Sequence, residues 1–236
     1  MLMYKIVVLL TFVALLIYNI CMISFMDLIV IFVIVLVSMV LHEMAHAYVA
    51  YALGDTTAKD EGRLSPNPMV HIDPIMSVLV PMLLFISGGP VFGGAKPVPI
   101  DSRNLKWGPW GMALVAFAGP LMNFILAFVG FMIGHFTGWF YGSGGEIMYS
   151  ISTNFLYANL GFFAFNLIPI PPLDGSRILY AIAPDGIRDV MEQIERSFGI
   201  LLVFVLVLVF GSSLSAFTRE IMTNIVKFFF MLVGVS

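Results

Sequence analysis

The chain has 236 residues, of which 60% are hydrophobic and only 11% charged, and its mean hydropathy is +1.01. About a quarter of the residues in a soluble domain are charged. This composition therefore excludes an ordinary water-soluble enzyme and indicates a protein of the lipid bilayer. A net charge of −3, with no basic block, also argues against nucleic acid as a partner.

Several apolar stretches are long enough to cross a bilayer, which takes about 20 helical residues. The first of them exceeds the length of a signal-peptide core and has no small-residue cleavage site after it, which favours a retained helix over a signal peptide. Ile221–Val235 predicts either a short final span or an interfacial helix. We therefore expect an all-α membrane protein, a polytopic bundle of about five to six transmembrane helices. The expected full spans are Lys5–Ile23, Leu28–Leu53, Trp110–Phe136, Ile147–Ile168 and about Phe198–Thr218.

The region 54–109, between the second and third full spans, differs from the rest because it is rich in glycine and proline. Its apolar piece Ile75–Ser87 would rise only about 20 Å as a helix. This length predicts a re-entrant segment that enters and leaves on one side of the membrane. We expect short strands in this region as well. Lys96–Ile100 predicts a short extended piece that is either an edge strand or an irregular loop, because its two prolines disfavour a helix or a central strand.

Basic residues set the expected orientation, since loops rich in Lys and Arg face the cytoplasm. Loops 54–74, 88–109 and 169–197 carry such residues, whereas loop 137–146 carries none. We expect the first three on the cytoplasmic side and the last on the opposite side.

The strongest chemical signal is the run His42-Glu43-Met44-Ala45-His46. Residues four apart share one helix face, so both imidazoles can bind one ion, and Glu43 lies beside them to take a proton from metal-bound water. Zinc suits two imidazoles and a carboxylate, with one position kept for water. The alternative is a pair of buried structural histidines, but ionisable groups within a membrane helix are costly without a function.

A third ligand is required, and Asp174 is the best candidate. It follows a proline-rich stretch, 169–172, that ends the preceding helix. It is also expected on the same side of the membrane as His42 and His46. The alternative is that Asp174 is simply the N-cap of a helix through Ser176–Ile182, and the two roles are compatible.

At this point the sequence resembles the site-2 protease family of intramembrane zinc metalloproteases, in its compact branch without PDZ or CBS domains. The resemblance rests on the histidine motif, on Pro-Pro-Leu-Asp174-Gly175, and on Gly119-Pro120-Leu121-Met122-Asn123, which is similar to the family's Gly-Pro-x-x-Asn motif. It implies that His42, His46 and Asp174 bind one zinc ion and that Glu43 is the general base. It also implies that Asn123 positions substrate or stabilises the oxyanion, although an interhelical hydrogen bond is an alternative role.

The resemblance implies a single integral membrane peptidase domain over 1–236, with its core at 28–210. Its substrates would be transmembrane segments of other proteins, and 62–74 or 93–100 could supply a strand edge to an extended substrate. We expect His135 to lie too far away to be a ligand. For His71, both a role at the mouth of the site and a purely structural role remain open.

Two other functions fit parts of the pattern. A catalytically silent relative that binds membrane proteins would be expected to lack a ligand or the base, and neither is missing here. A metal transporter would place acidic or histidine residues along several spans, whereas this chain concentrates them at one level.

Overall fold

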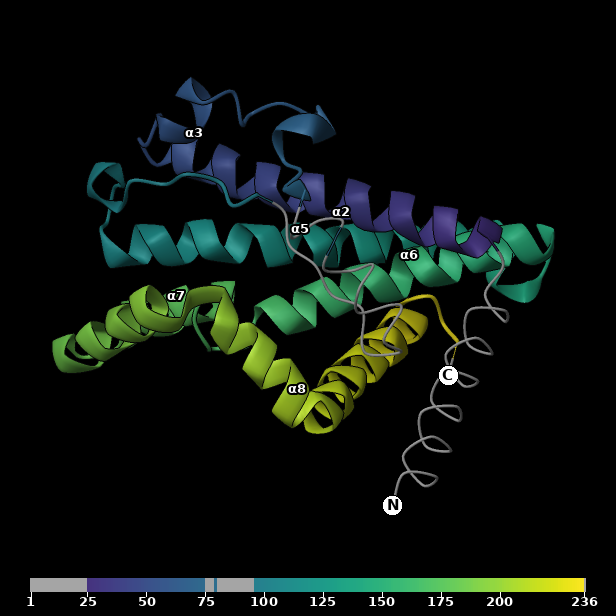
Figure 1. The fold of residues 1–236 in the computed structure, drawn as a ribbon. Helices are drawn as coiled ribbons and strands as arrows, with labels where there is room; N and C mark the ends of the chain where they lie inside the picture. Colours follow the sequence, from purple (N-terminus) through teal and green to yellow (C-terminus); the bar gives the residue numbers. More distant parts are fainter. Residues whose placement is uncertain (1–24, 75–78, 80–95, 236) are drawn as a thin grey trace, which may run out of the picture.

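The structure is a computed structural model that describes residues 25–74, 79 and 96–235, and the regular elements in this part of the chain are all helices (Figure 1). The expected span Lys5–Ile23 and almost all of the expected re-entrant segment Ile75–Ser87 lie outside the described residues. The α-helices are α2 (Phe25–Ala52), α3 (Thr57–Asp60), α5 (Pro109–Phe136), α6 (Gly145–Asn166), α7 (Asp174–Ile182) and α8 (Asp185–Leu232). Short 3-10 helices occupy Pro68–Val70, Ser102–Asn104 and Trp139–Tyr141.

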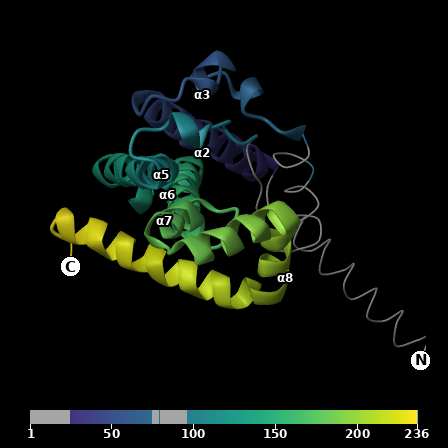
Figure 2. The same ribbon diagram turned by 90° about the vertical axis from the view of Figure 1, so that its left-hand side faces the viewer.

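Helix α5 lies at the centre of the fold and packs against α2, α6 and α7 (Figures 1 and 2). Its buried face consists mainly of small side chains, which let neighbouring helices approach closely. These buried small residues are Gly111, Ala113, Ala116, Ala118, Gly119, Ala127 and Gly134. The close packing places the middle of α5 directly beside the middle of α2 and the start of α7.

Two of the described helices are long and apolar enough to cross a membrane, Ile29–Ala52 and Pro109–Phe136. They correspond to the second and third expected spans. The stretch 147–168 is also largely helical, as α6, and 198–218 lies within α8. The all-helical class is thus confirmed for the described residues, and the number of spans stays a prediction.

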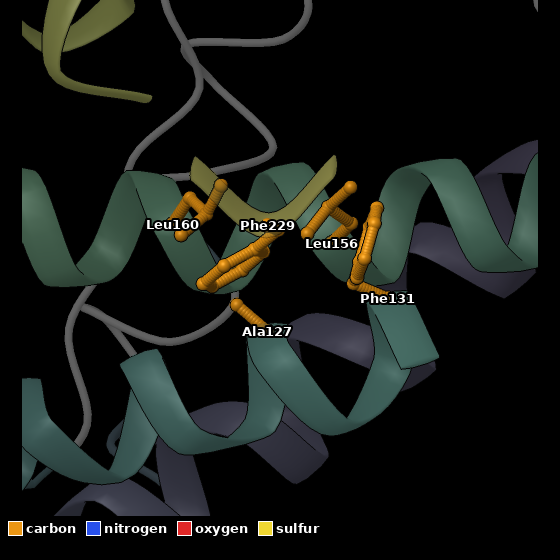
Figure 3. Packing of buried hydrophobic residues seen from close by; sticks show 5 residues of the cluster. All are labelled: Ala127, Phe131, Leu156, Leu160 and Phe229. Carbon is orange, nitrogen blue, oxygen red and sulfur yellow. The ribbon is translucent and has the colours of Figure 1, made fainter. Parts of the chain in front are cut away.

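Helix α8 is interrupted at Gly199, whose φ of 40° and ψ of −123° are not helical. Its C-terminal part runs beneath α5 and α6 (Figure 2). There Phe229 is fully buried between Ala127 and Phe131 of α5 and Leu156 and Leu160 of α6 (Figure 3). Residues 221–232 form the C-terminal end of α8, and Phe229 packs this end into the bundle.

The expectation of short strands is not met in the part of the chain that the structure describes. Residues 96–100 are extended but belong to no strand, and 62–74 forms turns and one 3-10 helix. The physical reason lies in the prolines, because Pro97 and Pro99 have no N–H to donate to a ladder. The segment is instead fixed by Lys96 N–H to His71 O and by Val98 N–H to Glu43.

Candidate metal centre

Helix α2 brings His42 and His46 together as their spacing predicts. Their Nε2 atoms lie 3.0 Å apart and both side chains are buried. Residues four apart in a helix are neighbours on one face, so this pairing follows from local geometry alone.

Helix α7 brings Asp174 to the same point. Its Oδ2 lies 3.2 Å from Nε2 of His42, and its Oδ1 lies 3.5 Å from Nε2 of His46. Asp174 is the first residue of α7, and the N-cap position is Leu173, which forms no side-chain cap. The interpretation of Asp174 as the capping residue is therefore wrong, and its carboxylate faces the histidines.

The start of α7 reaches this position because Gly175 packs against the end of α6. A Cβ on Gly175 would lie 2.3 Å from the carbonyl oxygen of Leu167. Arg188 of α8 donates to the carbonyl oxygens of Tyr180 and Ala181 near the other end of α7. Both ends of this short helix are thus held, and Asp174 with them.

The Nδ1 atoms of the two imidazoles face acceptors on α5. Nδ1 of His46 is 2.7 Å from the carbonyl oxygen of Val115, and Nδ1 of His42 is 2.5 Å from Oδ1 of Asn123. A carbonyl oxygen can only accept, so Nδ1 of His46 carries the proton and its Nε2 keeps a lone pair. Such partners of the second ring nitrogen are typical of metal-binding histidines.

The ligand atoms fit a cation. Oδ2 of Asp174 is buried and has no hydrogen-bond donor among the described residues. Two Nε2 lone pairs cannot bond to one another, so their approach is favourable only when a cation or a proton lies between them. Two imidazoles and one carboxylate, each within 4.8 Å of the others, form the ligand set of a mononuclear zinc site with an open position.

Gly119 of α5 keeps the space in front of these atoms free. A Cβ there would lie 2.4 Å from Nε2 of His46 and 2.5 Å from Nε2 of His42. The glycine of the Gly119-Pro120 pair is therefore required by the close approach of α5 to the site.

Glu43 lies beside the histidines on α2, and its Oε2 accepts a hydrogen bond of 3.1 Å from the main-chain N–H of Val98. Val98 itself is buried and packs against Ala47 and Ala58. The extended segment 96–100 therefore passes directly alongside the expected general base.

Asp55, just beyond the end of α2, holds the residues that directly follow segment 96–100 in the chain. Its carboxylate is fully buried and accepts from Thr57, from the N–H of Asp101 at 2.8 Å and from Asn104. Burial acts to raise the pKa of Asp55, but the hydrogen bonds from Thr57, Asp101 and Asn104 outweigh it and hold this pKa below its ordinary value.

The remaining candidates lie elsewhere or take a different place. His135 is in the last turn of α5, where its Nδ1 meets the hydroxyl of Tyr141, and it is not part of the cluster. His71 is buried and its Nε2 meets the carbonyl oxygen of Ser65. Asn123 is fully buried and bonds both His42 and Asn159, so the interhelical hydrogen bond exists, while its role toward substrate stays a prediction.

Sequence reasoning missed Asn159, Val98 and the spatial reason for Gly119. The signal for Asn159 was an amide within an apolar stretch, which is costly unless it is hydrogen-bonded. No local signal pointed to Val98, whose contribution is a main-chain N–H.

The helical fold and the two-histidine, one-aspartate site together are those of a zinc-dependent hydrolase. The chain is 41% identical over 178 residues to "Putative zinc metalloprotease YwhC" of Bacillus subtilis, which covers 72% of this chain and 76% of that protein. It is 30% identical over 215 residues to "Putative zinc metalloprotease Rip2" of Mycobacterium tuberculosis strain H37Rv, covering 85% and 73%. A zinc metalloprotease of Methanocaldococcus jannaschii is 31% identical over 153 residues, 65% of this chain and 34% of that protein.

No family model and no solved structure matches the chain. The Bacillus and Mycobacterium relatives nevertheless show the family, because each is at least 30% identical to this chain over more than two thirds of its own length. The chain belongs to the site-2 protease family and is a zinc metalloprotease, and His42, His46 and Asp174 form a group that could hold its metal ion.

Proposed function

We propose that this protein is an intramembrane endopeptidase that hydrolyses peptide bonds in or near transmembrane segments of other membrane proteins. The observation that carries the proposal is the position of the two histidines inside one candidate span and the close approach of a second candidate span to their ring nitrogens. His42 and His46 lie inside Ile29–Ala52, and Gly119, which faces their Nε2 atoms, lies inside Pro109–Phe136.

The exposed surface of α5 supports a lipid environment. Large apolar side chains recur on it every three or four residues and so form one continuous face. A soluble protein rarely leaves so extensive an apolar surface open. The exposed residues are Leu114, Phe117, Leu121, Ile125, Val129, Ile133 and Phe136.

The depth of the site supports access from one side. His42 lies about 15 Å along the helix axis from the C-terminal end of α2, at 1.5 Å per residue. Gly119 lies about the same distance from the N-terminal end of α5. These two helix ends flank the region 54–109, whose basic residues favour the cytoplasmic side. We therefore propose a multi-pass protein whose active site opens toward the cytoplasm.

The chemistry follows from the positions of the side chains. Bound zinc would polarise the scissile carbonyl and lower the pKa of its water toward about 7. Glu43 would accept a proton from the attacking water and then deliver it to the leaving nitrogen. His42, His46 and Asp174 would hold the metal, and their burial strengthens every electrostatic interaction at the site.

The substrate would have to be extended at the site, because an intact helix hides its peptide bonds. Segment 96–100 could guide such a substrate. Residues in an extended chain alternate in direction, and the N–H groups of Lys96 and Val98 are used toward the protein. Pro97 and Pro99 leave only carbonyl acceptors on the opposite edge, so a substrate there would donate its own N–H groups.

The test is cleavage in liposomes. Purified protein would be reconstituted with a single-span substrate protein, and the fragments would be sized by mass spectrometry to locate the cut relative to the span. We expect cleavage in or near the apolar span that requires zinc and Glu43. Zinc uptake into the same liposomes without any proteolysis would contradict the proposal and favour a transporter.

A further inference from the structure

A chain of amide side chains extends away from the metal centre across three helices. Asn123 of α5 meets Nδ1 of His42, and its Nδ2 donates to Oδ1 of Asn159 on α6 at 3.0 Å. Nδ2 of Asn159 donates in turn to the carbonyl oxygen of Phe155 at 2.9 Å. Both asparagines are fully buried.

The direction of every hydrogen bond in this chain is set at its far end. The carbonyl oxygen of Phe155 can only accept, so Asn159 must turn its NH2 group toward it and its oxygen toward Asn123. Asn123 must then turn its NH2 group toward Asn159 and its oxygen toward His42. His42 is left with one option, a proton on Nδ1 and a lone pair on Nε2, which is the atom in the metal cluster.

We propose that Asn159 is a positioning residue of the zinc site, which acts through Asn123 to fix the tautomer of His42. Without Asn159 the amide of Asn123 could turn over and present its NH2 group to His42. Nδ1 would then accept, the proton would move to Nε2, and the metal would lose a ligand. His46 needs no such relay, because the carbonyl oxygen of Val115 sets its tautomer directly.

The two histidines of one motif are thus prepared in different ways, one by a main-chain carbonyl and one by a relay of side chains. The relay depends on the packing of α6 against α5 and of α5 against α2. A small movement of α6 would therefore affect metal binding at His42 before it affected His46.

The experiment measures Zn²⁺ affinity by competition with a chromophoric chelator, together with the absorption spectrum of the Co²⁺ form. Asn159→Leu should weaken Zn²⁺ binding roughly tenfold to a hundredfold, the usual effect of losing a partner of a ligating histidine. It should also change the Co²⁺ spectrum. The matched control is Asn154→Leu on the same helix, whose amide donates to the hydroxyl of Ser150 and which should leave both readouts unchanged.

A double-mutant cycle separates the relay from simple packing. If Asn159 acts through Asn123, the variant with both Asn123→Leu and Asn159→Leu should bind Zn²⁺ no more weakly than Asn123→Leu alone. Additive losses, or unchanged affinity in Asn159→Leu, would overturn the inference. If Asn159→Leu does not fold, Asn159→Ala is measured in the same way.

The inference rests on the zinc site that the proposed function uses, and the two can fail separately. Wild-type protein that binds Zn²⁺ but cuts no membrane substrate would contradict the proposed function and leave the relay intact. Normal cleavage by the wild type, with normal Zn²⁺ affinity in Asn159→Leu, would contradict only the relay.

Discussion

The main-chain N–H of Val98 donates a hydrogen bond of 3.1 Å to Oε2 of Glu43, across 55 positions of sequence. This contact joins the extended segment 96–100 to the carboxylate expected to move the proton. The same segment is attached to His71 through Lys96 N–H at 2.8 Å. A substrate lying along this segment, as proposed above, would therefore be beside the expected base.

Removing the N–H of Val98 should slow cleavage without loss of metal. Val98→Pro deletes a hydrogen bond to a charged acceptor, and we expect cleavage to fall roughly tenfold to a hundredfold. Zinc content should stay at the wild-type level. Val98→Ala keeps the N–H and serves as the control, so an equal loss of activity in both variants would assign the effect to the side chain.

The role of Glu43 is tested by Glu43→Gln, which keeps the size of the side chain and removes its basicity. Cleavage should fall by at least about a hundredfold, as expected when a general base is lost, while zinc binding is retained. Glu146→Gln, in the exposed first turn of α6, should behave like the wild type. Substantial cleavage by Glu43→Gln would exclude Glu43 as the base.

Asp174 should be essential for the metal. Asp174→Ala leaves two imidazoles without their carboxylate, and we expect zinc affinity to fall by more than about a hundredfold. Losing a residue that only hydrogen-bonds to a metal ligand can already lower metal affinity about a hundredfold. Metal analysis after dialysis at fixed free zinc would measure it. Asp189→Ala, at an exposed position on α8, is the control. Full zinc content in Asp174→Ala would remove Asp174 from the ligand set.

Gly119 should tolerate no side chain. Gly119→Ala introduces a clash with both imidazoles at 2.4 and 2.5 Å. Overpacking of this kind costs roughly 1–3 kcal/mol, so zinc affinity should drop about tenfold or more. Gly161→Ala in α6, where a Cβ would meet nothing within 4 Å, should bind zinc normally. Equal zinc affinity in the two variants would show that α5 does not approach the site so closely.

The buried carboxylate of Asp55 should make stability depend on pH. Its pKa is lowered in the folded protein, so its contribution is fully present above the unfolded-state value of about 3.9 and is lost as the pH falls toward the folded value. Near neutral pH, Asp55→Asn should lower the free energy of unfolding by roughly 1–3 kcal/mol and so lower the unfolding temperature. The difference from wild type should shrink in acid.

Thermal unfolding in detergent at several pH values would measure this difference. Asp189→Asn, an exposed site on α8, is the control and should follow the wild type. A difference between Asp55→Asn and wild type that grows as the pH falls would contradict the sign of the shift.

Much of the site could be read from the sequence because it depends on local geometry. His42, Glu43 and His46 share one turn and a little more of one helix, so their spacing alone places them together. The class of fold follows as directly, because long apolar stretches can satisfy their main-chain groups in a bilayer only as helices or closed barrels.

Other features depended on how separate helices pack. The sequence by itself determined the histidine pair, the base beside it and the apolar helices that carry them. Only the tertiary structure decided that Asp174 faces the histidines rather than capping α7, that Asn123 and Asn159 orient His42, and that Gly119 must lack a side chain. These contacts join residues on different helices that are 36 (Asn123 and Asn159) to 132 (His42 and Asp174) positions apart in the sequence. Their formation depends on the rotation and register of one helix against another, which no local periodicity encodes.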